Sequence, residues 1–189
     1  MTDSSFGNLY DRFSQRLGTA GGHTHQMTGT GELASAIDTL HPTTGPEPRV
    51  VWIAGETATL APELLDALRA RGLEPRVSTG PAEVRDQPLG LAIARATIAE
   101  TGSSLMVEPT VEGRSVTLMT DILIVLCESD QLVPSLMEAA PILRDVSRDG
   151  ASYATFITGP SRTADIERTL AVGVQGPGVF HVIFTDRIA

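Results

Sequence analysis

The spacing of hydrophobic residues near the start of the chain predicts helical structure. Apolar residues recur at intervals of three and four over residues 4–17, the pattern of an amphipathic helix, and the glycines that follow end it. Thr28 or Thr30 is suited to begin a second helix as its N-cap. The elements predicted before residue 49 are a helix over residues 4–17, a short strand over 23–27, a helix over 32–40 and a proline-rich loop over 41–48.

From residue 49 the pattern changes to strands that alternate with helices. Residues 122–127 are apolar without alternation, which is typical of a central strand covered on both faces. Residues 89–99 fit either a strand, over 89–93, or a helix, and residues 104–108 and 115–119 flank a turn that suggests a hairpin. The remaining segments are predicted as strands over 49–54, 75–78, 154–158 (buried) and 179–184, and as helices over 63–71, 130–147 (capped by Asp130, and kinked or broken at Pro141) and 163–173.

This alternation predicts an α/β fold with a mostly parallel sheet and helices on both of its faces. The chain has 189 residues, which is the usual size of one α/β domain, and it shows no internal repeat. We expect residues 1–47 to form an N-terminal helical arm of the same domain, and residues 48–189 to form the α/β body.

The charged residues exclude several kinds of chemistry. All 14 basic residues are arginines, so a lysine Schiff base and the lysine-containing phosphate loop of P-loop proteins are both excluded. The 23 acidic residues give a net charge of −9, and no run of arginines interrupts them. This balance argues against a nucleic-acid partner, which would require a basic surface.

The single cysteine and the absence of long apolar runs limit the class of protein. Cys127 alone cannot form a disulfide within the chain or a four-cysteine metal or iron–sulfur site, and as the end of a buried strand it is expected to be an inert hydrophobic residue. The longest apolar run, residues 122–127, is too short to span a membrane, and the N-terminal residues lack the pattern of a signal peptide. We therefore expect a soluble, cytoplasmic protein without a membrane span.

The first candidate site follows the strand predicted at residues 154–158, because ligands of open α/β sheets bind beyond the carboxyl ends of strands. A turn that contains Gly159, Ser161 and Arg162 leads there into the predicted helix, so hydroxyls, a guanidinium and a helix N-terminus would together suit an anion. In the alternative interpretation, Ser161 or Thr163 only caps that helix and Asp165 complements its dipole. Acidic residues at this position would also repel an anion.

The second candidate site is the turn formed by Glu100, Thr101, Gly102 and Ser103. A buried Glu100 could act as a nucleophile or a general base, whereas the structural alternative is a glutamate that caps or hydrogen-bonds a neighbouring turn.

The four histidines and the common catalytic motifs give no further site. His23 and His25 lie two apart, so on a strand they face the same side, but no third ligand is near them and we predict no metal site. His181 is expected to be a core or edge residue. The chain has neither a G-x-G-x-x-G segment after a strand nor a G-x-S-x-G segment.

Two segments resemble a known protein family. The run ITGPSRTADIERTLAVGVQGPG, followed by HVIFTDR, resembles the C-terminal signature of the LutC/YkgG family of lactate-utilisation proteins, also called the LUD domain. The run AETGSSLMVEP, followed by SVTLMTDILIVL, resembles the second signature of the family. Together the two cover roughly residues 90–187. The chain departs from the family at Gln175, where members often carry histidine.

The resemblance implies a three-layer α/β/α sandwich similar to the NagB/RpiA/CoA-transferase group. It also implies an accessory, non-redox role in the oxidation of L-lactate to pyruvate, within a three-protein set whose other members carry iron–sulfur clusters. This chain would hold no cofactor itself. We expect it to bind a small anionic ligand at a site composed of Thr101, Gly102, Ser103, Gly159, Ser161, Arg162, Thr163 and Asp165. The alternatives are a stand-alone CoA-transferase-like or sugar-phosphate enzyme that uses Glu100, and a small-molecule sensor.

Overall fold

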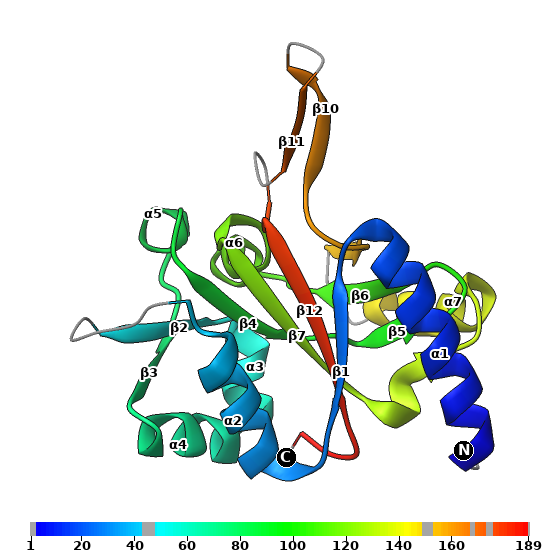
Figure 1. Ribbon diagram of the computed structural model, residues 1–189, viewed down its shortest axis with the longest axis horizontal. Helices are drawn as coiled ribbons and strands as arrows, with labels where there is room; N and C mark the ends of the chain where they lie inside the picture. Colours follow the sequence, from blue (N-terminus) through cyan, green and yellow to red (C-terminus); the bar gives the residue numbers. More distant parts are fainter. Residues whose placement is uncertain (1–2, 43–47, 149–152, 167–168, 173–175, 189) are drawn as a thin grey trace.

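A six-stranded parallel sheet forms the centre of the protein (Figure 1). The structure, a computed structural model, describes residues 3–42, 48–148, 153–166, 169–172 and 176–188. In spatial order the strands are β1 (His23–Met27), β12 (Val179–Thr185), β7 (Ile122–Glu128), β4 (Leu89–Ile93), β2 (Arg49–Ile53) and β3 (Leu73–Val77). All neighbouring pairs are parallel, so the predicted α/β fold is confirmed.

Both faces of this sheet are covered, which explains the uniformly apolar β7. Leu123 and Val125 face one core and Ile124 and Leu126 face the other, and none of the four side chains is exposed. On one face lie α2 (Gly29–Leu40) and α4 (Pro62–Ala70). On the other face lie α1 (Asp3–Ala20), α5 (Pro81–Val84) and α6 (Val111–Met119). The short α3 (Gly55–Leu60) follows β2.

A second sheet adds a layer that the sequence pattern did not reveal. Its four strands, in spatial order, are β8 (Leu132–Val133), β5 (Ala96–Ile98), β6 (Ser103–Val107) and β9 (Ala154–Ile157). Met106 of β6 packs in the core beneath the parallel sheet, whereas Leu105 and Val107 face the opposite side. There they pack with α7 (Leu136–Arg148) through residues such as Ala139 and Val146.

The helix predicted over residues 163–173 is wrong. The chain instead forms an antiparallel ribbon of β10 (Arg162–Ile166) and β11 (Thr169–Val172), which projects from the body at the top of Figure 1. The segment is rich in β-branched residues, including Thr163, Ile166 and Thr169. These side chains lose rotamer freedom in a helix and favour extended backbone.

The hairpin predicted from residues 104–108 and 115–119 is also wrong. Residues 115–119 belong to α6, which begins after Thr110, where the threonine Oγ1 accepts a hydrogen bond from the Gly113 nitrogen at 3.1 Å. The N-cap therefore decided the structure of this segment. Strand β6 pairs instead with β5 and β9.

Three further boundaries differ from the sequence prediction. The ambiguous residues 89–99 contain two strands, β4 and β5, and no helix. The predicted helix over 130–147 begins at Leu136, after a 3-10 turn (Ser129–Gln131) and β8, and it continues past Pro141. Strand β9 is a partly exposed edge strand of the second sheet and is not buried in the parallel sheet.

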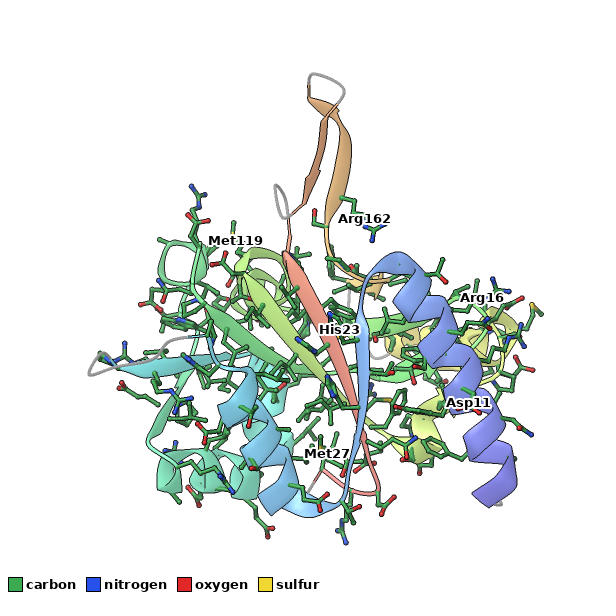
Figure 2. The ribbon with its side chains drawn as sticks, viewed as in Figure 1. Asp11, Arg16, His23, Met27, Met119 and Arg162 are labelled. Carbon is green, nitrogen blue, oxygen red and sulfur yellow. The ribbon has the colours of Figure 1, made fainter. Side chains whose placement is uncertain are left out.

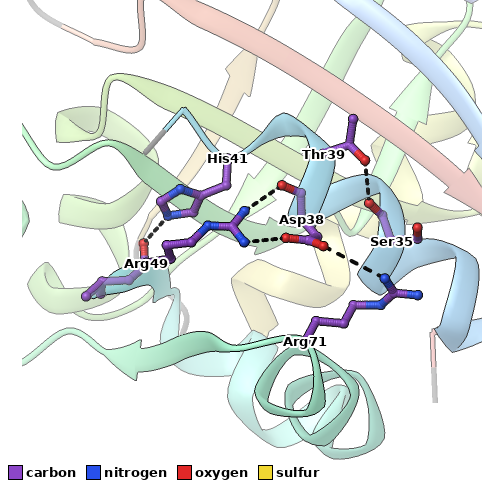
Figure 3. Close-up of polar contacts among 7 residues, drawn as sticks. Ser35, Asp38, Thr39, His41, Arg49 and Arg71 are labelled. Carbon is purple, nitrogen blue, oxygen red and sulfur yellow. Dashed lines mark hydrogen bonds and ion pairs between the residues drawn. The ribbon is translucent and has the colours of Figure 1, made fainter. Parts of the chain in front are cut away.

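A polar network fastens the end of α2 to the start of β2 (Figure 3). Asp38 Oδ1 lies 2.6 Å from Arg49 Nη1, and Arg71 Nη1 lies 3.8 Å from the other carboxylate oxygen. Arg49 also donates to the Asp38 carbonyl oxygen at 2.8 Å, and His41 Nε2 lies 3.0 Å from the Val50 carbonyl oxygen. One carboxylate therefore serves two arginines.

We expect Asp38→Ala to lower the free energy of unfolding by about 1–2 kcal/mol, because it leaves a partly buried guanidinium without its carboxylate. Asp66→Ala is the matched control. It removes an ion pair to Arg69 whose side chains are 79% and 56% exposed, and it should cost less than about 0.5 kcal/mol. Equal losses in urea titrations of the two variants would show that the network contributes no more than a surface pair.

No helix in the described part of the chain is long and apolar enough to cross a membrane.

Candidate functional site

A pocket of about 480 Å³ opens at the carboxyl ends of β4 and β7. In an open α/β sheet this is where the strands expose backbone groups and loops to a ligand. The residues that line the pocket come from β4 and β7, from the segment between β4 and β5, from the 3-10 turn, from α3, from α7 and from the C-terminal segment: Leu60, Ile93, Ala94, Arg95, Glu128, Gln131, Ile142, Asp145 and Ile188.

Backbone hydrogen bonds fix the rim of this pocket. The Ala94 nitrogen donates to the Leu126 carbonyl oxygen at 2.8 Å, which ties the end of β4 to β7. The next residue, Arg95, donates its backbone nitrogen to the Leu105 carbonyl oxygen of the second sheet at 2.9 Å. Arg95 therefore lies where the chain passes from one sheet to the other, and its position is set by both.

The Arg95 side chain supplies a positive charge to the pocket. It is exposed, and no side chain or backbone group of the described residues forms an ion pair or hydrogen bond with its guanidinium. The two acidic side chains of the lining are both engaged. Glu128 Oε1 accepts a hydrogen bond from the Ile188 nitrogen at 3.0 Å, and Asp145 lies 3.4 Å from Arg148.

The lining matches a small ligand with one anionic group. Leu60, Ile93, Ile142 and Ile188 provide apolar walls, and a guanidinium binds a carboxylate through two parallel hydrogen bonds. Because the carboxylates of Glu128 and Asp145 outnumber the single guanidinium, the lining can pair with one anionic group at most and disfavours a ligand that carries several.

The two segments predicted as a ligand site do come together, although away from the carboxyl ends of the parallel strands. The Glu100–Gly102 turn joins β5 to β6, and β6 pairs with β9 so that Ser104 lies opposite Ile157. The Ser103 hydroxyl oxygen lies 2.7 Å from the hydroxyl oxygens of both Thr101 and Thr158. These hydroxyls satisfy one another, which leaves fewer donors for an anion.

Both turns pack against the carboxyl end of α1. A Cβ at Gly102 (φ +70°) would lie 2.5 Å from the Leu17 nitrogen, and a Cβ at Gly159 (φ +84°) would lie 2.9 Å from the Ala20 carbonyl oxygen. The carbonyl groups at a helix end carry negative partial charge and repel an anion. The helix N-terminus that was expected to attract an anion is absent, because β10 follows the Gly159 turn.

Arg162 lies at the base of the β10–β11 ribbon, on the side where α1 ends (Figure 2). Its guanidinium occupies the space in which a side chain at Gly21 would lie. A cation here complements the negative end of α1. The Ser161 nitrogen donates to the Pro177 carbonyl oxygen at 2.8 Å. The side chains of Thr163 and Asp165, and all of Gln175, lie outside the described residues.

Glu100, the candidate nucleophile, is exposed, and its carboxylate accepts a hydrogen bond from the Leu136 nitrogen at 3.3 Å. Leu136 is the first residue of α7. This is the helix-capping contact that the structural alternative predicted, and Glu100 does not line the pocket.

Glu108, which follows β6, was not singled out from the sequence. Its side chain is 3% exposed and has no hydrogen bond or ion pair to the described residues. Burial, together with the nearby carboxylate of Glu56, raises the pKa of Glu108 to about 7, although Arg114 opposes this. The only sequence signal was a glutamate directly after a strand.

The three histidines of β1 and β12 also converge, which the sequence did not predict. His25 Nε2 lies 3.0 Å from His181 Nδ1, and the rings of His23 and His181 stack at 4.9 Å. Within the described residues, however, no group of three or more histidine, cysteine or acidic side chains is arranged to hold a metal ion.

Comparisons with known proteins identify relatives of the second half of the chain. A family model described as the LUD domain matches residues 82–185. Lactate utilization protein C of Geobacillus thermodenitrificans is 34% identical over 103 residues, that of Bacillus subtilis is 34% identical over 103 residues, and that of Oceanobacillus iheyensis is 36% identical over 101 residues. Each match covers 52% of this chain but only 43% of the relative, so the similarity spans less than half of each of these proteins.

A solved structure shows the same fold over nearly the whole chain. The crystal structure of a DUF162 family protein from Deinococcus radiodurans superposes with a TM-score of 0.69 and covers 95% of this chain and 98% of the other. The two sequences are 19% identical. This likeness establishes the fold alone.

Proposed function

The chain belongs to the LUD domain family, and we propose that it serves in lactate utilisation as a cytoplasmic, non-redox protein that binds a small monocarboxylate in the pocket at the carboxyl ends of β4 and β7. The names of the relatives support the biological role. The observation that carries the binding site is Arg95, an exposed residue of the pocket lining whose guanidinium has no ionic partner among the described residues.

Three features of the pocket support this choice over the turns near Arg162. The pocket offers a volume of about 480 Å³, whereas the hydroxyls of Thr101, Ser103 and Thr158 are already hydrogen-bonded to each other. It also has apolar walls, formed by Leu60, Ile93, Ile142 and Ile188, against which the carbon skeleton of a small carboxylate can pack. Finally, it lies where ligands of this fold class bind.

The properties of Cys127 support a role without a redox centre. The side chain is fully buried, and burial raises the pKa of the thiol to about 12, so this single cysteine is an unreactive thiol at neutral pH, and one cysteine cannot supply the four thiolates of an iron–sulfur site. Electron transfer would then belong to partner proteins that carry such clusters. Co-purification from cells grown on lactate tests this partnership, and recovery of the chain alone would contradict it.

We expect Arg95→Ala to weaken the binding of L-lactate about 10- to 100-fold, because a charge-assisted hydrogen bond contributes about 1.5–3 kcal/mol. Isothermal titration calorimetry with L-lactate and with pyruvate measures this directly. Arg162→Ala is the matched control, since it removes an exposed guanidinium from the other candidate site. A loss of binding in Arg162→Ala but not in Arg95→Ala would place the ligand at the turns and contradict the proposal.

A further inference from the structure

Three histidines from two strands form one cluster at the edge of the parallel sheet. The cluster consists of His23 and His25 on β1 and His181 on β12 (His23 is labelled in Figure 2). The His25 and His181 rings share a hydrogen bond of 3.0 Å, and the His181 ring lies 4.9 Å and 5.2 Å from the centroids of the other two. His181 is 8% exposed, and His23 is exposed.

The cluster lies across the junction that holds β1 in the sheet. β1 is an edge strand, and within the described part of the sheet its single neighbour is β12, which it meets from His23 opposite His181 to Met27 opposite Thr185. The His25–His181 bond is a side-chain contact that spans these two strands. An edge strand depends on one ladder of hydrogen bonds, so a side-chain contact across that ladder affects how often the ladder opens.

The shared hydrogen bond requires that at least one of the two imidazoles is neutral. One ring must donate and the other must accept, and because a protonated imidazole has no acceptor nitrogen, the bond is lost when both rings are protonated. A second proton in the cluster would also place two positive charges about 5 Å apart in a partly buried site. The geometry therefore penalises protonation of the joined strands more than protonation of the separated strands.

Few charged groups near the cluster could stabilise a protonated histidine. On the same face of the sheet, β7 places the aliphatic Ile124 opposite His181, and α2 contributes Glu32 to the groove that His25 lines. Glu32 Oε2 accepts a hydrogen bond from the Thr28 nitrogen at 2.7 Å. Among the described residues no ion pair links Glu32 to the cluster.

We propose that the histidine cluster is an acid-sensitive latch that holds β1 to β12 when the rings are neutral and promotes opening of this strand pair when they take up protons. Two of the three histidines have a lowered pKa, as this proposal expects. Burial and the neighbouring histidines lower the pKa of His181 to about 4, and burial and His23 lower the pKa of His25 below the usual 6.5.

The sign and the pH window follow from these shifts. A released His181 takes up a proton as the pH falls below 6.5, whereas the latched His181 resists protonation until about pH 4. The latched state therefore loses stability between these two values, and the opening constant of the strand pair should rise about tenfold by about pH 5.5.

Opening of β1 has a direct consequence for its surroundings. The turn before His23 contains Gly21, against which Arg162 packs, and it follows Ala20, against which Gly159 packs. A latch at the start of β1 thus links protonation to the base of the β10–β11 ribbon. This inference is independent of the carboxylate pocket.

Native-state hydrogen exchange of the full chain tests the latch. We expect the opening constant of the Thr24 and Gln26 amides, corrected for intrinsic exchange, to rise at least tenfold from about pH 7.5 to about pH 5.5, while the Val125 amide of β7 changes less than threefold. The double variant His25→Gln/His181→Gln should lose this pH dependence. Glu32→Gln is the control and should retain it.

Two results would overturn the latch. One is a parallel rise in exchange at β1 and β7 of the wild type, which would show global unfolding instead of opening of one strand pair. The other is an undiminished pH dependence in the double variant. If that variant does not fold, the comparison of β1 with β7 in the wild type still decides the question, because a flat β1 profile excludes the latch.

Discussion

Replacement of Phe184 by alanine is expected to lower the free energy of unfolding by about 3–5 kcal/mol. Phe184 is 1% exposed and lies at the centre of an aromatic group that joins α1 to the sheet. Its ring meets Phe6, Tyr10 and Phe13 edge-on, with centroids 6.0, 5.5 and 5.2 Å away. The substitution leaves a cavity that three other rings cannot fill without moving α1.

The size of this effect depends on burial and not on ring chemistry. Phe156 is 40% exposed on β9, and Phe156→Ala should cost less than about 1 kcal/mol. Urea unfolding followed by the fluorescence of Trp52, the single tryptophan, gives both values. If Phe184→Ala costs no more than Phe156→Ala, then α1 is not held to the sheet by this aromatic group.

Substitution of Glu108 by glutamine is expected to stabilise the protein by about 3 kcal/mol above pH 7 and to have little effect below pH 4.5. The carboxyl has a pKa raised from 4.5 to about 7 in the folded state, since it is buried and lies near Glu56. The fold therefore favours the neutral carboxylic acid, and ionisation is resisted until the pH approaches 7. Stability falls as the pH rises from 4.5 to about 7, and glutamine, which has no charge, removes this loss.

In the wild-type protein, we expect a second group to offset much of this pH dependence of the free energy of unfolding. His181 acts in the same window with the opposite sign, because its lowered pKa of about 4 makes the fold lose stability as the pH falls below 6.5. Near pH 5.5, folding leads Glu108 to take up a proton and His181 to release one, so the two slopes largely cancel.

Unfolding free energies measured from about pH 4 to 8 test this cancellation. We expect a nearly flat profile for the wild type and a loss of stability toward acid for Glu108→Gln, in which the effect of His181 is no longer masked. Glu63→Gln, at an exposed position, should follow the wild type. A Glu108→Gln profile parallel to that of the wild type would show that folding does not raise the pKa of the buried carboxyl.

The core of the fold could be predicted because its signals are local. The uniformly apolar residues 122–127 require cover on both faces, and β7 has it. The second sheet could not be predicted, because β5 and β8 are three and two residues long and pair only through tertiary contacts. At residues 163–173, a pattern that fitted a helix was overridden by the extended preference of threonine and isoleucine.

The candidate site also has one part that could be predicted from the sequence and one part that could not. The convergence of Ser103 with Thr158 was anticipated when the two turns were joined into one proposed site. The pocket was missed because the carboxyl-end rule was applied to residues 154–158, which form β9 of the second sheet and not a strand of the parallel sheet. Applied to β4 and β7, the same rule leads to Arg95 and Glu128, but the assignment of residues 89–99 was ambiguous between strand and helix.

Amide chemical-shift mapping during a titration with L-lactate decides whether the ligand binds in the pocket at the strand ends. We expect the largest shifts at Arg95, Glu128 and Gln131, around this pocket, and we expect them to disappear in Arg95→Ala. Shifts concentrated instead at residues 101–103 and 158–162, and unchanged in Arg95→Ala, would contradict it and place the ligand at the turns against α1.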